Sequence, residues 1–158
     1  MQKIAVITGA SSGIGAATAD QFLARGYSVI NIARRPSPVQ GVINIAADLS
    51  ADNGAVNAAQ ACIANLPAES SEVALIHNAS LMLKDSAQSC ETEAIMRVLV
   101  VNVLAVNTLN RKLMTHMAAG SSVIFVGSTL SEKAVAGAYS SLSVSMHNWD
   151  KCGQPARI

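Results

Sequence analysis

The stretch Ile4-Ala-Val-Ile-Thr-Gly-Ala-Ser-Ser-Gly-Ile-Gly-Ala-Ala-Thr18 decides the fold of this chain. Its apolar run Ile4–Ile7 predicts a short strand, and helix-like apolar spacing begins at Ala16. Three glycines stand between them in the pattern G-x-x-x-G-x-G. Strand, tight turn and helix direct backbone N–H groups and the positive end of a helix dipole at one spot, which suits a phosphate. An ordinary glycine-rich turn is the alternative interpretation.

Further strands and helices alternate along the rest of the chain. This alternation predicts an α/β fold, a parallel sheet with helices on both faces, in a single domain over residues 1–158. The expected strands are Ile4–Ile7, Tyr27–Ala33, Val42–Ala46, Val73–Ile76 and Ser122–Val126, and the expected helices are Ala16–Ala24, Ala55–Ala64 and Thr92–Met117.

The composition excludes several classes of function. Lys and Arg total 11 against 10 Asp and Glu, so no charge imbalance indicates nucleic acid or an anionic membrane. Cys62, Cys90 and Cys152 lack metal-ligand spacing, and we expect no metal site. The apolar stretch Ala94–Val106 is interrupted by an arginine and an asparagine, so we expect no membrane span. The first residues enter a strand without a signal peptide, and we expect a cytoplasmic protein.

The motif Thr8-Gly-Ala-Ser-Ser-Gly-Ile-Gly15 resembles the cofactor loop of the short-chain dehydrogenase/reductase family. The resemblance implies a Rossmann-like, doubly wound parallel sheet of order 3-2-1-4-5 that lacks the family's last strands. Gly9 is expected to permit the turn, Gly13 to let the backbone approach a pyrophosphate, and Gly15 to let helix and strand pack closely. The loop residues implied to bind the dinucleotide are Thr8, Gly9, Ser11, Ser12, Gly13, Ile14 and Gly15.

Two arginines follow the second predicted strand. In a dinucleotide-binding fold, an acidic residue at this place binds the ribose 2′-hydroxyl, whereas arginine accommodates a 2′-phosphate. Here Ala33 fills the acidic position, and Arg34 and Arg35 follow it. This favours NADP(H) over NAD(H), because guanidinium fits phosphate well. Two solvated arginines are the alternative, and Ser12 supplies no second cation.

Two further strand ends resemble family positions that contact the cofactor. Asp48 and Leu49 follow the third predicted strand, where the family's aspartate contacts the adenine amine. Asp48 could equally cap the next helix. Asn78 and Ala79 lie in His77-Asn-Ala-Ser80, which resembles the family's Asn-Asn-Ala-Gly turn with two substitutions. Asn78 would stabilise the centre of the sheet, or serve as a generic turn residue. His77 is interpreted as structural.

Three residues are candidates for the family's catalytic positions, with Tyr139 two residues closer to Ser128 than the family spacing, which would reach Ser141. Asn102, inside the long apolar helix, would hold a proton-relay water, or would be a core or interface amide with a backbone partner. Ser128, with Thr129 and Ser131 as rivals, would hydrogen-bond a substrate carbonyl. Tyr139 is the best remaining proton donor for hydride transfer between the nicotinamide and a carbonyl or alcohol substrate.

The resemblance ends near residue 139. The family places a lysine four residues after the tyrosine, where its charge lowers a phenol pKa that is otherwise about 10. Ser143 stands there instead, and residues 140–158 form an atypical tail. We therefore expect a truncated reductase, with a frameshift as one explanation of its tail. A non-catalytic dinucleotide-binding or interaction module is the alternative. The apolar helix 92–117 resembles a family dimer interface, which predicts a homo-oligomer.

Overall fold

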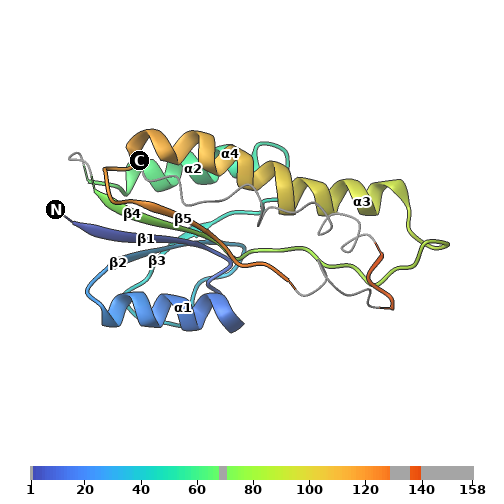
Figure 1. Ribbon diagram of the computed structural model, residues 1–158, viewed down its shortest axis with the longest axis horizontal. Coiled ribbons are helices and arrows are strands. Elements are labelled where there is room, and N and C mark those ends of the chain that lie inside the picture. The colour runs from blue at the N-terminus through green and yellow to red at the C-terminus, as the bar shows by residue number, and fades with distance from the viewer. Residues whose placement is uncertain (1, 68–70, 129–135, 140–158) are drawn as a thin grey trace.

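The computed structural model describes residues 2–67, 71–128 and 136–139, and its centre is a parallel sheet (Figure 1). The strand order is β3-β2-β1-β4-β5, and each neighbouring pair is parallel. The sequence-based fold prediction is therefore confirmed. The strands are β1 (Lys3–Thr8), β2 (Ser28–Ala33), β3 (Ile43–Ala46), β4 (Glu72–His77) and β5 (Ser122–Phe125).

Helices cover both faces of this sheet. α1 lies against one face, and α2 and α4 lie against the other (Figure 1). The three inner strands, β1, β2 and β4, are buried on both sides. Successive residues of β1 therefore alternate between two cores: Ile4 and Val6 pack toward α2 and α4, whereas Ala5 and Ile7 pack toward α1. The helices are α1 (Gly13–Ala24), α2 (Gly54–Ala64), α3 (Thr92–Leu99) and α4 (Ala105–Leu113).

The predicted uninterrupted helix Thr92–Met117 is wrong in detail. A π-helical turn, Val100–Leu104, separates α3 from α4, and a 3-10 turn, Met114–His116, follows α4. A π turn contains an extra residue, which shifts the angular register of the helix, and sequence periodicity alone does not reveal it. Taken as one run, Thr92–His116 is long and apolar enough to cross a membrane by length and composition only, as are core helices of soluble proteins.

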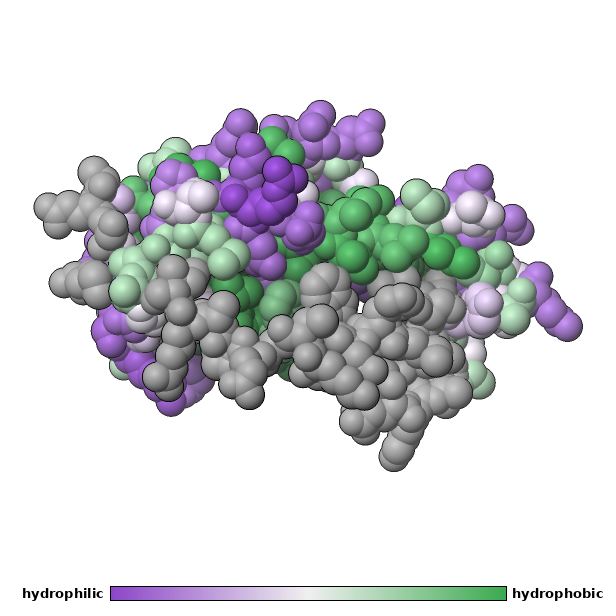
Figure 2. All heavy atoms as spheres, turned by 45° about the horizontal axis from the view of Figure 1, so that its top comes forward, coloured by the Kyte–Doolittle hydropathy of each residue, from purple (hydrophilic) through white to green (hydrophobic). Residues whose placement is uncertain are grey.

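The two halves of this run differ in what they contact. α4 buries Leu109 and Leu113 in the core over the sheet. α3 projects past the carboxyl ends of the strands (Figure 1), and hydrophobic side chains gather along its part of the surface in Figure 2. Met96 is 51% exposed and Leu104 is 53% exposed. One half therefore belongs to the core, and the other presents an apolar surface.

Candidate functional site

The glycine turn joins β1 to α1 at the carboxyl edge of the sheet. Gly9 has φ +75° and Gly13 has φ +53°, a left-handed conformation that side chains rarely adopt. The Gly9 N–H donates to Ile32 O at 2.9 Å, which ties the turn to β2. Ser12 precedes α1 without a side-chain cap, and the first turn of α1 contains no acidic residue. The first N–H groups of α1 therefore have no side-chain acceptor at this helix end and suit an anion.

Gly15 is required by its neighbours in the turn. A Cβ atom there would overlap the Gly9 carbonyl oxygen and lie 2.5 Å from Asn78 Nδ2. We expected Gly15 to let the helix pack closely against a strand. In the structure, Gly15 instead lets α1 lie close to the glycine turn and to Asn78, the residue after β4. Asn78 Nδ2 also donates to Thr8 O at 3.1 Å and to Gly9 O at 3.2 Å. Gly15 leaves room for this amide.

Thr8 lies beneath the turn and connects two strand ends. Its Oγ1 accepts hydrogen bonds from the N–H groups of Asn78 and Ala79, both at 3.0 Å, and the residue is 2% exposed. Because the hydroxyl is occupied and buried, Thr8 positions the site rather than forming its surface. Thr8, Gly13 and Gly15 do not line the cavity described next.

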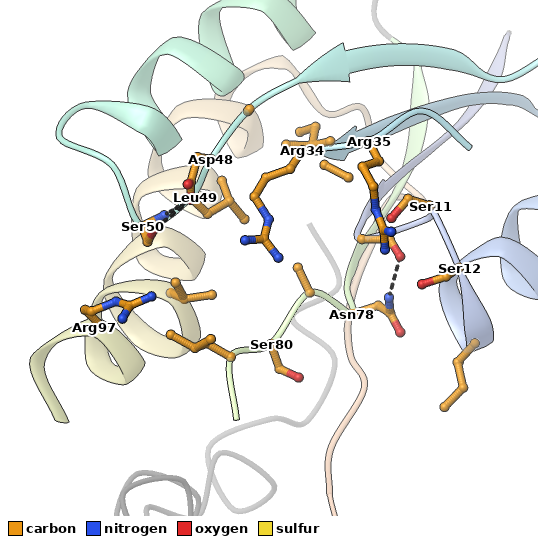
Figure 3. Close-up of a pocket in the computed structure, with 18 residues that line it drawn as sticks. Ser11, Ser12, Arg34, Arg35, Asp48, Leu49, Ser50, Asn78, Ser80 and Arg97 are labelled. Carbon is orange, nitrogen blue, oxygen red and sulfur yellow. Dashed lines mark hydrogen bonds between the residues drawn. The ribbon is translucent and has the colours of Figure 1, made fainter. Parts of the chain in front are cut away.

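A cavity of about 350 Å³ opens at the carboxyl ends of β1 to β4 (Figure 3). Its size and shape suit part of a dinucleotide, and its wall is formed by five separate chain segments that the sheet brings together. Ten of the residues predicted to bind a cofactor line it: Gly9, Ser11, Ser12, Ile14, Arg34, Arg35, Asp48, Leu49, Asn78 and Ala79.

Three arginines contribute to the cavity wall. The Arg34 side chain reaches toward the middle of the cavity, and Arg35 extends toward Ser11 (Figure 3). The third, Arg97 of α3, was not predicted from sequence. It precedes the lining residue Val101 by four positions, so helical spacing could have paired the two. Which helix face meets the cavity follows only from the tertiary structure.

The Asp48 side chain accepts hydrogen bonds from Ser50 and does not cap a helix. Asp48 Oδ1 accepts from the Ser50 N–H at 2.9 Å and from the Ser50 hydroxyl at 2.6 Å. These two hydrogen bonds lower the pKa of Asp48, and the nearby Arg34 and Arg97 guanidinium groups contribute further. The residue at the N-cap of α2 is Asn53, which makes no side-chain cap. The alternative that Asp48 caps the next helix is therefore wrong.

Asn102 lies in the π-helical turn and binds the chain after β4. Its Oδ1 accepts from the Leu81 N–H at 2.8 Å, and its Nδ2 donates to Leu81 O at 3.1 Å. This is the backbone partner that the structural interpretation of Asn102 required. The side chain does not line the cavity.

His77 packs at the end of β4. It is 4% exposed, its Nε2 lies 2.8 Å from Asn110 Oδ1, and its ring stacks on Phe125 with centroids 5.0 Å apart. Burial lowers the pKa of His77 although the hydrogen bond with Asn110 opposes this. His77 is thus a buried, neutral imidazole that links β4 to α4 and β5, which agrees with its interpretation as a structural residue.

The remaining catalytic candidates lie outside the cavity wall. Ser128 is exposed three residues beyond β5. Tyr139 is 39% exposed, and its N–H donates to Asp85 O at 3.4 Å, next to a bridge between Asp85 and Ala138. The rivals Thr129 and Ser131, and the tail 140–158, lie outside the described residues. None of the three catalytic candidates, Asn102, Ser128 and Tyr139, lines the cavity.

Comparison with known proteins identifies the family. The family model for short chain dehydrogenases matches residues 3–143. The chain belongs to the short-chain dehydrogenase family. These proteins are oxidoreductases, and membership implies a nicotinamide dinucleotide cofactor.

Solved structures and a curated relative agree with this membership. A short chain dehydrogenase family protein from Francisella tularensis has a TM-score of 0.79 and 27% identity over 92% of this chain and 59% of its own. A 3-ketoacyl-(acyl-carrier-protein) reductase from Brucella melitensis, complexed with NADH, has a TM-score of 0.77 and 26% identity over 91% of this chain and 64% of its own. An uncharacterized oxidoreductase from Mycobacterium tuberculosis is 46% identical over 43 residues, 27% of this chain and 17% of the relative.

The chain is short relative to these proteins. It spans about three fifths of the Francisella structure. The part that matches contains the glycine turn and the cavity.

Proposed function

We propose that this chain binds NADP(H) in the cavity at the carboxyl edge of the sheet. The pyrophosphate would lie at the glycine turn and the first N–H groups of α1. The adenosine 2′-phosphate would lie beside Arg34 and Arg35, and the adenine beside Asp48 and Leu49. The fit is supported by the crowded backbone at Gly9 and Gly15, where side chains would occupy the space that the turn and Asn78 need.

One observation carries the choice of NADP(H). Arg34 and Arg35 both line the cavity directly after β2, and Ala33 stands where an acidic residue would repel a phosphate. The Brucella relative was solved with NADH, and in our proposal the residues after β2 decide between NADH and NADPH.

The proposed reaction is hydride transfer between the nicotinamide and a carbonyl or alcohol substrate. The cofactor supplies or accepts the hydride. Ser128 would donate a hydrogen bond to the substrate oxygen, and the Tyr139 hydroxyl would give or take the proton. Asn102 would act through Leu81, because its amide is occupied by the main chain there. Its contribution to a proton relay would then be to fix the chain segment beside the cofactor.

Cofactor binding tests the first part of this proposal. We expect the protein to bind NADPH at least tenfold more tightly than NADH, since one hydrogen bond to a charged group contributes about 1.5–3 kcal/mol. Arg34→Ala should remove most of this difference, and Arg25→Ala, at an exposed arginine that does not line this cavity, should leave it unchanged. Isothermal titration calorimetry measures both. Equal affinities for the two cofactors in the unaltered protein would refute NADP(H) preference.

A non-catalytic dinucleotide-binding module is the second candidate. It is favoured by Ser143, which stands where the family places the lysine that activates the tyrosine. Turnover of NADPH with a panel of ketones and aldehydes separates the two functions. Turnover that disappears in Tyr139→Phe supports an enzyme, whereas tight NADPH binding without turnover supports the module.

We also propose that residues 92–117 contact a second copy of the chain. Met96 and Leu104 expose more than half of their surface on this helix run, and burial of such apolar surface contributes about 25 cal/mol per Å². Light scattering during gel filtration should show a dimer that Leu104→Glu dissociates. An unchanged mass in this variant would place any interface elsewhere.

A further inference from the structure

Arg97 is the one charged side chain on the α3 wall of the cavity. Its guanidinium points into the cavity, and it lies on the same side of the close-up as Ser50 and Asp48 (Figure 3). Within the described residues, the single ion pair within 4.0 Å joins Lys3 and Glu72, so no carboxylate holds Arg97. Its donors are therefore available to a ligand.

The surroundings of Arg97 suit a flat apolar ring with a polar edge. Leu49 and Val101 both line the cavity, and Val101 lies one helical turn after Arg97. Such a pair of apolar side chains can cover the two faces of a base. Two polar groups lie around the same space: the Asp48 carboxylate, which accepts hydrogen bonds, and the Arg97 guanidinium, which donates them.

Asp48 has one oxygen left for a ligand. Ser50 donates both of its hydrogen bonds to Oδ1, which leaves Oδ2 as an acceptor. A carboxylate held in this ionised, oriented state can accept a hydrogen bond from the 6-amino group of adenine. The Leu49 N–H follows Asp48 on the same wall and suits N1, one of the two acceptors beside that amino group. The other acceptor, N7, is left for a donor from α3.

We infer that Arg97 donates a hydrogen bond to N7 of the adenine while Asp48 accepts from its 6-amino group. This inference rests on the proposed function, because it requires an adenine nucleotide in the cavity. A 6-amino donor beside an N7 acceptor is the edge of adenine that protein side chains also recognise in the DNA major groove. Arg97 thereby becomes a specificity-determining residue for the base, separate from the two arginines assigned to the 2′-phosphate.

A double comparison of protein and ligand tests this contact. The ligands are ADP and 7-deaza-ADP, in which a carbon atom replaces N7. Both ligands lack the 2′-phosphate that Arg34 and Arg35 would bind. Isothermal titration calorimetry gives the affinity of each for the unaltered protein and for Arg97→Gln. We expect 7-deaza-ADP to bind about fivefold more weakly to the unaltered protein, in line with one charge-assisted hydrogen bond at a partly exposed site. In Arg97→Gln the two ligands should differ by less than about twofold.

Arg111→Gln is the matched control. Arg111 is exposed at the end of α4 and does not line the cavity, so this variant should keep the fivefold difference. The same 7-deaza difference in the unaltered protein and in Arg97→Gln would overturn the contact with N7 and leave nucleotide binding intact. Failure of the unaltered protein to bind either ligand while it binds NADPH would overturn this inference alone, and failure to bind NADPH as well would overturn the proposed function with it.

Discussion

The side-chain amide of Asn102 forms two hydrogen bonds with the main chain of Leu81, one as acceptor at 2.8 Å and one as donor at 3.1 Å. This pair joins the π-helical turn Val100–Leu104 to the segment after β4. Leu81 itself lines the cavity. Asn102, which the family resemblance suggests for a proton relay, therefore also fixes the wall of the cavity.

Loss of the Asn102 amide should destabilise the protein. Asn102→Ala leaves a partly buried N–H and C=O of Leu81 without their partner, which should lower the free energy of unfolding by about 1–3 kcal/mol. Asn107→Ala, at an exposed amide in α4, should change it by less than about 0.5 kcal/mol. Urea unfolding followed by circular dichroism measures both. An Asn102→Ala protein as stable as the unaltered one would show that the amide pair has no role in stability.

The buried hydroxyl of Thr8 should matter more than its methyl group. Thr8→Val keeps the shape but removes the acceptor of the Asn78 and Ala79 N–H groups, and we expect a loss of roughly 2–4 kcal/mol together with weaker NADPH binding. Thr8→Ser retains the acceptor and should lose at most about 1.5 kcal/mol. Equal losses in the two variants, measured by urea unfolding, would assign the effect to packing instead.

Gly15 should not tolerate a side chain. In Gly15→Ala the new Cβ meets the Gly9 carbonyl oxygen and the Asn78 amide, and the displacement should cost about 1–3 kcal/mol and disturb the glycine turn. Gly127→Ala is the control, because a Cβ there meets nothing within 4 Å. Thermal unfolding and NADPH titration should both separate the two variants. A Gly15→Ala protein with normal affinity would show that the turn can move without loss.

Stability should fall in mildly acidic solution because of His77. Burial lowers the pKa of His77 in the folded protein below the value of about 6.5 expected when the chain is unfolded. The unfolded state then binds more protons, so the free energy of unfolding decreases as pH falls from about 6.5 toward the lowered pKa.

Two histidine variants isolate this effect. His77→Gln cannot take up this proton and should show a flatter pH dependence in that window, although its stability at neutral pH also changes with the lost packing. His116→Gln, at an exposed histidine, should keep the dependence of the unaltered protein. Urea unfolding between about pH 5 and pH 7.5 provides the curves. A His77→Gln curve parallel to that of the unaltered protein would contradict the assignment.

Local patterns predicted the fold well because the three inner strands are short apolar runs that are buried on both sides. Ile4–Ile7 and Val73–Ile76 fall inside β1 and β4, and the glycine turn joins β1 to α1 as expected. The boundaries differ where capping and pairing decide them. The second strand begins at Ser28 rather than Tyr27, because the Tyr27 N–H donates to Phe22 O at 3.1 Å in the turn that ends α1.

The parts of the site that sequence missed depend on contacts between distant segments. The π-helical turn breaks the regular period around Asn102, and nothing in the local composition marks it. Arg97 meets the cavity only because α3 projects past the strand ends. Asp48 looked like a helix cap because its sequence context fits one, but Ser50 lies closer along the chain and forms a tight turn with it.

The central position of β1 also determines the order in which the sheet can form during synthesis. β1 leaves the ribosome first and can pair with β2 soon afterwards, but its other edge waits for β4, whose first residue is Glu72. At 5–20 residues per second, that delay is roughly 4–14 s. During this interval the nascent chain carries an apolar strand with one open edge, and the nucleotide cavity does not exist until α3 has also been made. The chain thus passes through an aggregation-prone stage before any ligand could stabilise it.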